Sequence, residues 1–362
     1  MLRGLSIVLV VVHHVALRIP LRDGVLAAYV PRQILVALEY NGYAGVFVFF
    51  VISGFLIALH SIQRWGGLPQ ISAGEFYARR AARILPALLL MVGVLASLHL
   101  ARVPYYTIDN PQQSLGGAVL AALGLYLNWY EGRTGYLPGN WDVLWSLSIE
   151  EAFYVGFPLA CLALRRERWI WPPLVVLALS LPVSLAALAG DEIWQEKAYL
   201  PGMAAIAVGI VAAMLVERRP RPRWAVVHAV GLIGGLGLAA SLLAGRQIRP
   251  LIGDGIMLLL TLSVGCLLAC LHWRHIAGRS RAQRWTGWLR SFGRLSYEIY
   301  LMHMFVVFAL VHVYRVGGFD VHLGALWYPP ALALSWALGL AMARWFVLPS
   351  ERRVRRLLIG TK

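Results

Sequence analysis

Charged residues are scarce in this chain: 14% of its 362 residues are Asp, Glu, Lys or Arg, and the mean hydropathy is +0.67. A soluble globular domain carries roughly 25% charged residues, so this composition excludes a chain whose surface is built to face water. A chain of this length holds about ten apolar spans of ~20 residues with short connections. We therefore predict an all-α polytopic membrane protein in which residues 1–362 form a single transmembrane domain.

Cysteine and acidic residues are also few, and their scarcity excludes other kinds of site. Cys161, Cys266 and Cys270 stand in apolar stretches without a paired spacing, so we expect neither a disulfide framework nor a metal site. The 33 basic residues outnumber the 17 acidic ones, but the arginines fall between apolar runs. This distribution follows the positive-inside rule of membrane proteins and argues against a nucleic-acid partner.

Eleven apolar segments can be marked, and the basic clusters between them set their direction. They cover about 3–19, 43–62, 84–101, 115–129, 143–164, 170–189, 199–216, 225–244, 250–271, 292–313 and 324–347. Basic clusters belong in the cytoplasm, yet three apolar segments separate the cluster ending at Arg83 from the cluster beginning at Arg165. One of the three therefore does not span. The shortest is 115–129, which we expect to be re-entrant or interfacial, leaving about ten spans and both termini in the cytoplasm.

Polar side chains stand inside four of the expected spans at similar depth. With a rise of 1.5 Å per residue, His14, Ser53 and His303 fall near the middle of their spans, and Glu150 lies roughly 10 Å from the outer end of its span. An ionised carboxylate at membrane depth costs at least a few kcal/mol, so such residues mark a functional site by default. We expect these spans to line one chamber near the midplane.

Five stretches carry motifs that appear in a fixed order along the chain. They are RGLSIVLVVVHH at 3–14, GVFVFFVISGFLI at 45–57, FYARRAARILPA at 76–87, WSLSIEEAFY at 145–154 and SYEIYLMH at 296–303. Together they resemble the acyltransferase 3 family of integral membrane acyltransferases. The resemblance covers nearly the whole chain, although any one of the motifs alone is a weak signal.

The resemblance implies transfer of an acyl group, usually acetyl, from cytoplasmic acetyl-CoA to a hydroxyl of an extracytoplasmic or lipid-linked glycan. It also implies the bacterial inner membrane as the location, membrane lipids as partners and no metal. Some family members modify small-molecule hydroxyls, and that alternative stays open. The chain opens on the first motif and ends soon after the last span, so we expect no appended periplasmic hydrolase-like domain.

His14 is the expected general base. Imidazole titrates near physiological pH, and a base within hydrogen-bond reach of a hydroxyl assists its attack on a thioester. The family motif selects His14 over His13. It also selects Glu150, which would orient His14 or, alternatively, pair with Arg3 or with a tyrosine hydroxyl. We expect the neighbouring Glu151 to be interfacial or structural.

Arg80 and Arg83 are the expected donor-binding residues. They are neighbours on one helix face, and the planar guanidinium group matches phosphate oxygens such as those of coenzyme A. The alternative role is topology and contact with anionic headgroups.

Four other polar residues of the motifs are candidates for the pocket: Arg3, Ser53, Tyr154 and His303. For Ser53, a small side chain that allows close helix packing is favoured over an acyl-enzyme role, which would need an activating base. Tyr154 shares a helix face with Glu150, four residues earlier. His303 would add polarity to the pocket or complete a hydrogen-bond network.

Two other classes of function compete with this interpretation. Intramembrane ionisable residues also mark transport pathways, so a transporter or flippase of a lipid-linked or anionic substrate is an alternative. Such proteins often contain inverted repeats, and the two halves of this chain show none. A scaffold or receptor does not explain a histidine and a carboxylate at similar depth. The sequence therefore favours a membrane O-acyltransferase.

Overall fold

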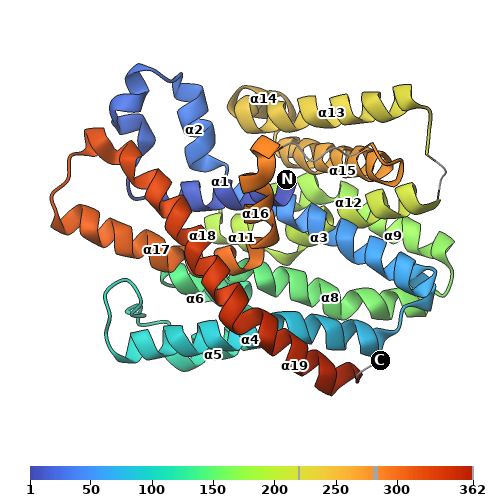
Figure 1. Cartoon of the computed structure of the whole chain (residues 1–362), viewed down its shortest axis with the longest axis horizontal. Helices are drawn as coiled ribbons and strands as arrows, with labels where there is room; N and C mark the ends of the chain where they lie inside the picture. The colour runs from blue at the N-terminus through green and yellow to red at the C-terminus, as the bar shows by residue number, and fades with distance from the viewer. Residues whose placement is uncertain (219–220, 280–283, 361–362) are drawn as a thin grey trace. The chain divides into compact units, whose positions relative to one another are not determined.

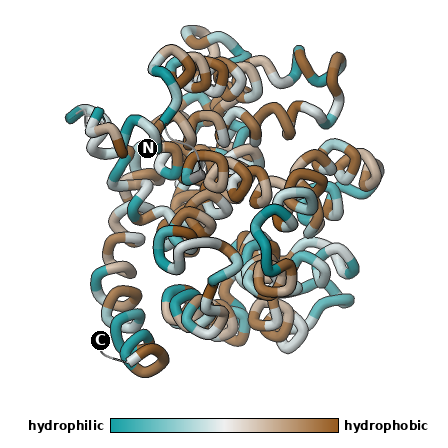
Figure 2. Tube along the Cα trace, turned by 90° about the vertical axis from the view of Figure 1, so that its right-hand side faces the viewer, coloured by the Kyte–Doolittle hydropathy of each residue, from teal (hydrophilic) through white to brown (hydrophobic). Residues whose placement is uncertain are grey.

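The computed structural model describes residues 1–218, 221–279 and 284–360, and within these ranges every regular element is helical (Figure 1). Eight stretches of the described residues are long and apolar enough to cross a membrane. They are Gly42–Trp65 (α3), Ala73–Leu100 (α4), Gly139–Leu164 (α7 with α8), Glu192–Glu217 (α11 with α12), Trp224–Leu243 (α13), Gly255–Ile276 (α15), Ser296–Val316 (α17) and Val321–Ile359 (α18 with α19). Hydrophobic residues dominate these helices (Figure 2). The prediction of an all-α polytopic membrane protein is confirmed.

Two further expected spans are shorter than a full crossing. Helix α1, Leu2–Ala16, has 15 residues, about 22 Å at the helical rise. The segment expected at 170–189 forms α9, Glu167–Leu179, and α10, Leu181–Ala186, which meet at Ser180. With the eight long stretches, these helices occupy the ten segments that the sequence predicts to cross.

The segment at 115–129 forms no continuous span. Helix α5, Leu115–Leu123, has nine residues, about 14 Å, against about 30 Å for the hydrocarbon core. Leu125 then takes a positive φ of 62°, and a new helix, α6, runs over Leu127–Thr134. This interruption agrees with the prediction that the segment is re-entrant or interfacial.

The chain folds into two compact units that interleave along the sequence. Unit 1 comprises Met1–Gly42, Ala73–Glu151 and Trp288–Lys362, and unit 2 comprises Tyr43–Ser72 and Ala152–Gly287. Helix α8, Trp145–Leu164, begins in unit 1 and ends in unit 2. The division is therefore not one into successive domains.

Helix α17 is the buried centre of unit 1, where it packs against α1 and against α18, Tyr328–Met342. Ile299, Leu301 and Met304 of α17 are completely buried, as expected for a helix with neighbours on several sides. Two of its tyrosines also bond to other helices. The Tyr300 hydroxyl donates to the Val143 carbonyl at 2.8 Å, and the Tyr297 hydroxyl donates to the Ile84 carbonyl at 3.3 Å. These bonds fix the rotation of α17 about its axis.

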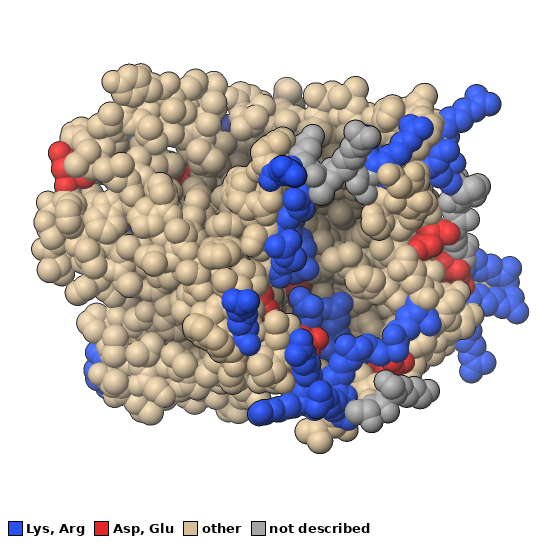
Figure 3. All heavy atoms as spheres, viewed as in Figure 1, with Lys and Arg blue, Asp and Glu red and all other residues tan. Residues whose placement is uncertain are grey.

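The last helix of unit 1 is amphipathic and basic. A π-helical turn at Ala343–Val347 leads from α18 into α19, Leu348–Ile359, which packs along α4. Basic side chains gather over α19 (Figure 3), where Arg352, Arg353, Arg355 and Arg356 are exposed. Such a helix suits the interface with anionic headgroups.

Helices α3 and α12 (Tyr199–Arg218) approach closely in unit 2 because glycines stand at their contact. A Cβ atom on Gly209 would lie 1.9 Å from the Val51 carbonyl oxygen, and one on Gly54 would lie 2.0 Å from the Ile206 carbonyl oxygen. Small residues are the usual means of close packing between membrane helices. The contact therefore depends on glycine at both positions.

We expect Gly209→Ala to destabilise the protein by about 1 to 3 kcal/mol, as in other overpacked sites. The matched control is Gly235→Ala on α13, where a Cβ atom would meet nothing within 4 Å. That change should be neutral or stabilising by up to about 1 kcal/mol, the helix preference for alanine. Thermal unfolding in detergent measures both, and equal melting temperatures for the two variants would contradict the role of this contact.

Candidate functional site

Two histidine rings from distant parts of the chain meet inside unit 1. His303 on α17 places Nε2 3.3 Å from Nδ1 of His14 on α1, and the ring centroids are 4.9 Å apart. His303 is completely buried, whereas His14 keeps part of its surface exposed. His14 is therefore the member of the pair that a substrate can reach.

The hydrogen bonds of the pair set its tautomers. His303 Nδ1 lies 2.7 Å from the Tyr300 carbonyl oxygen, so it carries a proton and leaves Nε2 as an acceptor. His14 Nδ1 lies 2.8 Å from the Val10 carbonyl oxygen and must also donate. The Nδ1–H group of His14 then serves both Val10 and His303, and His14 Nε2 is left with a free lone pair. A neutral imidazole with this free nitrogen has the form that a general base requires.

The Tyr300 hydroxyl secures the helix that carries His303. It bonds to the Ser146 hydroxyl as well as to the Val143 carbonyl, both at 2.8 Å. These contacts hold the start of α8 against α17 three residues before His303. The packed core therefore fixes the position of the His303 ring.

His13, next to His14, faces a different neighbour. Its Nδ1 contacts the Glu39 carbonyl oxygen at the end of α2, Arg32–Tyr40. A Cβ atom on Gly42 would lie 2.4 Å from His13 Cγ, so the ring packs directly against the start of α3. His13 therefore links α1 to α2, and only His14 contacts His303.

A charged cluster in the same unit combines the start of α17 with residues of α4 and α8. Glu151 lies within the electrostatic reach of Arg80 and Glu150, and its buried Oε1 has no hydrogen-bond partner among the described residues. Glu298 is likewise near Arg83 and Arg3. The predicted donor-binding arginines therefore share this cluster with three carboxylates.

Glu150 takes its place in this cluster, close to Glu151 and Tyr297. The expected pairing of Glu150 with His14 stays a prediction. Among the described residues, the His14 ring contacts Val10, His303 and the ring of His13. We expected Glu151 to be interfacial or structural, and the burial of its Oε1 oxygen without a hydrogen-bond partner among the described residues was not predicted. The available signal was the pair of adjacent glutamates in an apolar run.

Arg18 lies next to the histidine pair, on the side away from the charged cluster. Its Nη1 donates to the His14 carbonyl at 2.9 Å, and its guanidinium group lies 4.8 Å from the centre of the Phe308 ring. Asp142 is also near this charge. The sequence offered a signal for Arg18, because a residue four positions after His14 shares its helix face.

A family model described as an acyltransferase domain matches residues 1–347. The chain belongs to the acyltransferase 3 family. This match confirms the resemblance drawn from the five motifs, and His14, Glu150, Arg80, Arg83 and His303 all stand in the matched region. Their individual roles remain predictions.

Curated relatives of this chain carry names that refer to O-acetylation. Peptidoglycan O-acetyltransferase OatA of Listeria monocytogenes is 29% identical over 198 residues, covering 51% of the chain and 30% of the relative. Putative peptidoglycan O-acetyltransferase YrhL of Bacillus subtilis is 25% identical over 341 residues, covering 83% and 50%. A putative O-acetyltransferase of Staphylococcus aureus is 26% identical over 337 residues, covering 83% and 52%. The chain thus spans about half the length of these relatives or less, and no solved structure matches it.

Two other predicted residues of the acyltransferase lie in unit 2. Ser53 precedes Gly54 on α3, at the close contact with α12. Tyr154 on α8 is almost completely buried. Their expected places in the pocket stay predictions.

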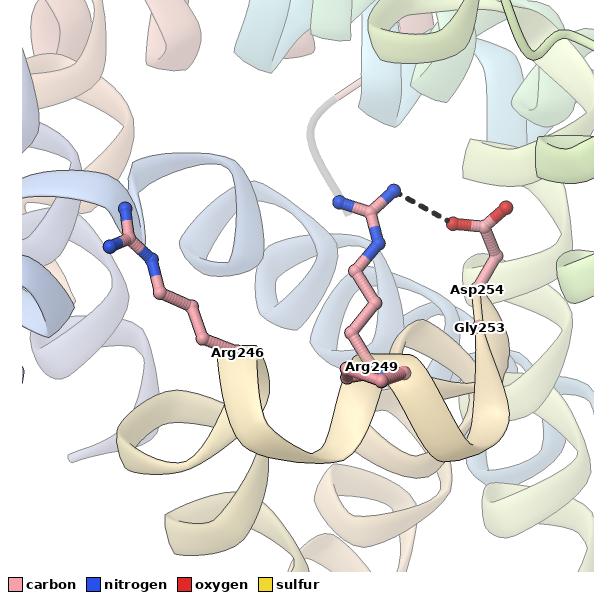
Figure 4. A pocket seen from close by; sticks show the side chains of 5 residues that line it. Arg246, Arg249, Gly253 and Asp254 are labelled. Atoms are coloured by element: carbon pink, nitrogen blue, oxygen red, sulfur yellow. Dashed lines mark hydrogen bonds and ion pairs between the residues drawn. The ribbon is translucent and has the colours of Figure 1, made fainter.

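An exposed pocket on α14, Gly245–Ile252, offers different chemistry (Figure 4). Arg246 and Arg249 rise from the same side of this helix, and Arg249 pairs with Asp254 at 3.2 Å. Ion pairs between exposed side chains contribute about 1 kcal/mol or less. The one carboxylate that lines the pocket, Asp254, is paired with Arg249, so we do not assign the reaction to this pocket.

Proposed function

We propose that this protein is a membrane O-acetyltransferase that uses acetyl-CoA and acetylates a hydroxyl of an extracytoplasmic or lipid-linked glycan. The observation that carries the proposal is the histidine pair, in which His14 Nε2 is free to accept a proton. Membership of the acyltransferase 3 family and the names of the relatives support acetyl as the group and a glycan as the acceptor. We place the protein in the bacterial inner membrane with both termini in the cytoplasm.

In the proposed reaction one residue, His14, both accepts and returns the proton. The acceptor oxygen attacks the thioester carbonyl while His14 Nε2 removes its proton, and the resulting imidazolium is stabilised through Nδ1–H by Val10 and His303. Collapse of the tetrahedral intermediate breaks the C–S bond, and the coenzyme A sulfur leaves with the proton returned from His14. The product is an acetyl ester, and the imidazole is neutral again.

The direction of the helices in unit 1 supports access from two sides. Helices α1, α4 and α17 all begin near the charged cluster and end toward Arg18, Tyr105 and Phe308. The histidine pair stands between these two ends. In our proposal, coenzyme A binds at the arginine end and the acceptor hydroxyl approaches from the Arg18 end.

Arg80→Gln and Arg83→Gln should each raise the KM for acetyl-CoA about tenfold, because each removes a charged contact to a phosphate worth about 1.4 kcal/mol or more. The kcat should change less than threefold. Steady-state kinetics in lipid nanodiscs measure both constants. The matched control is Arg79→Gln, since Arg79 is engaged with Glu75 at 2.6 Å. An equal rise in KM for the Arg79 variant would contradict specific phosphate binding.

Transfer itself is tested with the purified protein in nanodiscs, radiolabelled acetyl-CoA and soluble peptidoglycan fragments. The expected result is alkali-labile label on the glycan, since an ester is cleaved by base. Retention of all label on coenzyme A would contradict the proposal. Movement of an unmodified lipid-linked glycan across proteoliposomes would instead support the transporter alternative.

A further inference from the structure

An aromatic surface lies next to Arg18, on the side of the histidine pair opposite the charged cluster. The Tyr105 ring stacks on Phe308 with centroids 5.2 Å apart and an interplanar angle of 10°. The Tyr106 ring stacks on Phe305 with centroids 5.7 Å apart and an angle of 22°. Both tyrosines keep part of their surface exposed. Two rings thus rest on α17 and still offer surface to a ligand.

The backbone that carries these rings is strained. Tyr105 has a φ of 72°, in the left-handed region that costs a residue other than glycine about 1 kcal/mol or more. The stacking of two successive rings on α17 opposes that cost. Arg102, Leu125 and Arg165 also have a positive φ, so it is the stacked rings rather than the backbone that single out this loop.

Asn140 on α7, Gly139–Asp142, is a buried polar side chain. It is 0% exposed, and neither amide atom has a hydrogen-bond partner of normal geometry among the described residues. The Tyr106 hydroxyl lies beside it, so the amide stands just behind a part-exposed ring. Buried amides are almost always satisfied. The Asn140 side chain has a donor and an acceptor on one planar group. They match the carbonyl and the N–H group of a secondary amide.

Arg18 connects this surface to the reacting centre. Its guanidinium group lies over Phe308 and bonds to the His14 carbonyl. A Cβ atom on Gly139 would lie 3.3 Å from Arg18 Nη2 and 2.8 Å from Met304 Cε. Helix α7 therefore packs against both the arginine and α17. A sugar bound at the two tyrosines would lie next to His14.

We propose that Tyr105, Tyr106 and Asn140 form the acceptor subsite and bind a pyranose that carries an acetamido group. The apolar face of the sugar ring stacks on the tyrosine rings, which supply large contact area. A shift of the Tyr106 hydroxyl away from Asn140, with the ring still stacked on Phe305, admits the acetamido group to Asn140. There the Asn140 amide donates to the acetamido carbonyl and accepts from its N–H. This inference rests on the proposed function, because it names the acceptor of that reaction.

The test compares two tetrasaccharides that differ in the acetamido group. N,N′,N″,N‴-Tetraacetylchitotetraose, called chitotetraose below, carries it on every ring, and cellotetraose has hydroxyls in its place. For Asn140→Leu we expect the KM for chitotetraose to rise about tenfold, as for the loss of paired hydrogen bonds. The KM for cellotetraose and that for acetyl-CoA should stay within twofold. The melting temperature should fall by a few degrees at most, because Asn140 makes no hydrogen bond of normal geometry among the described residues and leucine has a similar volume.

Variants of Tyr106 test the stacking. Tyr106→Phe should keep the KM for cellotetraose within threefold, whereas Tyr106→Leu should raise it about tenfold. Tyr29→Leu is the control, since Tyr29 is 80% exposed in another loop of the same unit. An unchanged KM for chitotetraose in Asn140→Leu would overturn the subsite. A lower melting temperature with equal losses for both sugars would also overturn it, because Asn140 would then be structural.

Direct binding separates this inference from the proposed reaction. Calorimetric titration of the wild-type protein and of Asn140→Leu with chitotetraose requires no acetyl transfer. Weaker binding by the variant supports the subsite even if the wild-type protein transfers no acetyl group. Equal binding overturns the subsite even if transfer occurs.

Discussion

His14→Ala should lower kcat for acetyl transfer by about 100- to 10,000-fold, the usual contribution of a positioned general base. The KM values for acetyl-CoA and glycan should change little, because the ring takes up the proton only as the hydroxyl attacks. Initial rates with radiolabelled acetyl-CoA measure the loss. The same preparation should keep its melting temperature within a few degrees, since the His14 side chain bonds only to a carbonyl that α1 already uses and to His303.

His13→Ala is the matched control for this experiment. His13 is also a histidine on α1, but it contacts the Glu39 carbonyl and Gly42. Its loss should cost about 1 kcal/mol of stability, as for a typical hydrogen bond, and leave kcat within a few-fold of wild type. The assignment of His14 would be wrong if the two variants lost activity equally, or if His14→Ala remained fully active.

The helices of this protein follow from its apolar runs, because a helix that crosses a membrane needs about 20 consecutive apolar residues. The positions of the basic clusters added information about topology that the apolar runs alone do not contain. Counting crossings between Arg83 and Arg165 identified 115–129 as the segment that does not span, and its longest helix has nine residues. The break at Ser180 was not predicted, although the sequence offered a signal for it in Pro182, which stands in the first turn of α10.

The sequence predicted at which depth of the membrane the site residues lie, but not which neighbours their side chains face. The helical rise placed His14 and His303 at the same level, and their rings indeed meet. Which neighbour a side chain faces depends on how each helix is rotated, and a single sequence does not determine that rotation. The sequence therefore left Glu150 to orient His14 or to pair with Arg3 or a tyrosine hydroxyl. The structure places it near Glu151 and Tyr297, and its pairing stays a prediction. Asn140 escaped notice because nothing in the sequence distinguishes an unsatisfied buried amide from a surface one.

His303→Leu should lower kcat about 100-fold, although His303 never touches the substrate in the proposed reaction. His303 acts as a positioning residue: its Nε2 accepts from His14 Nδ1–H at 3.3 Å and keeps the other nitrogen of His14 free. Removal of this acceptor leaves the Val10 carbonyl alone to hold His14 Nδ1–H, so the ring turns or changes tautomer more easily, and a wrong tautomer is costly in comparable sites. Single-turnover kinetics with saturating acetyl-CoA measure the chemical step directly.

Rescue by a second variant distinguishes positioning from packing. Leucine and glutamine both fill most of the space of the His303 ring, but only the glutamine side chain has an oxygen that can accept from His14 Nδ1–H. His303→Gln should therefore recover at least tenfold of the lost kcat, with both KM values unchanged throughout. Equal loss in the two variants, or a loss that follows the melting temperature, would contradict the tautomer argument. Another group would then have to orient the His14 ring, and the carboxylates near Arg80 would be the next residues to test.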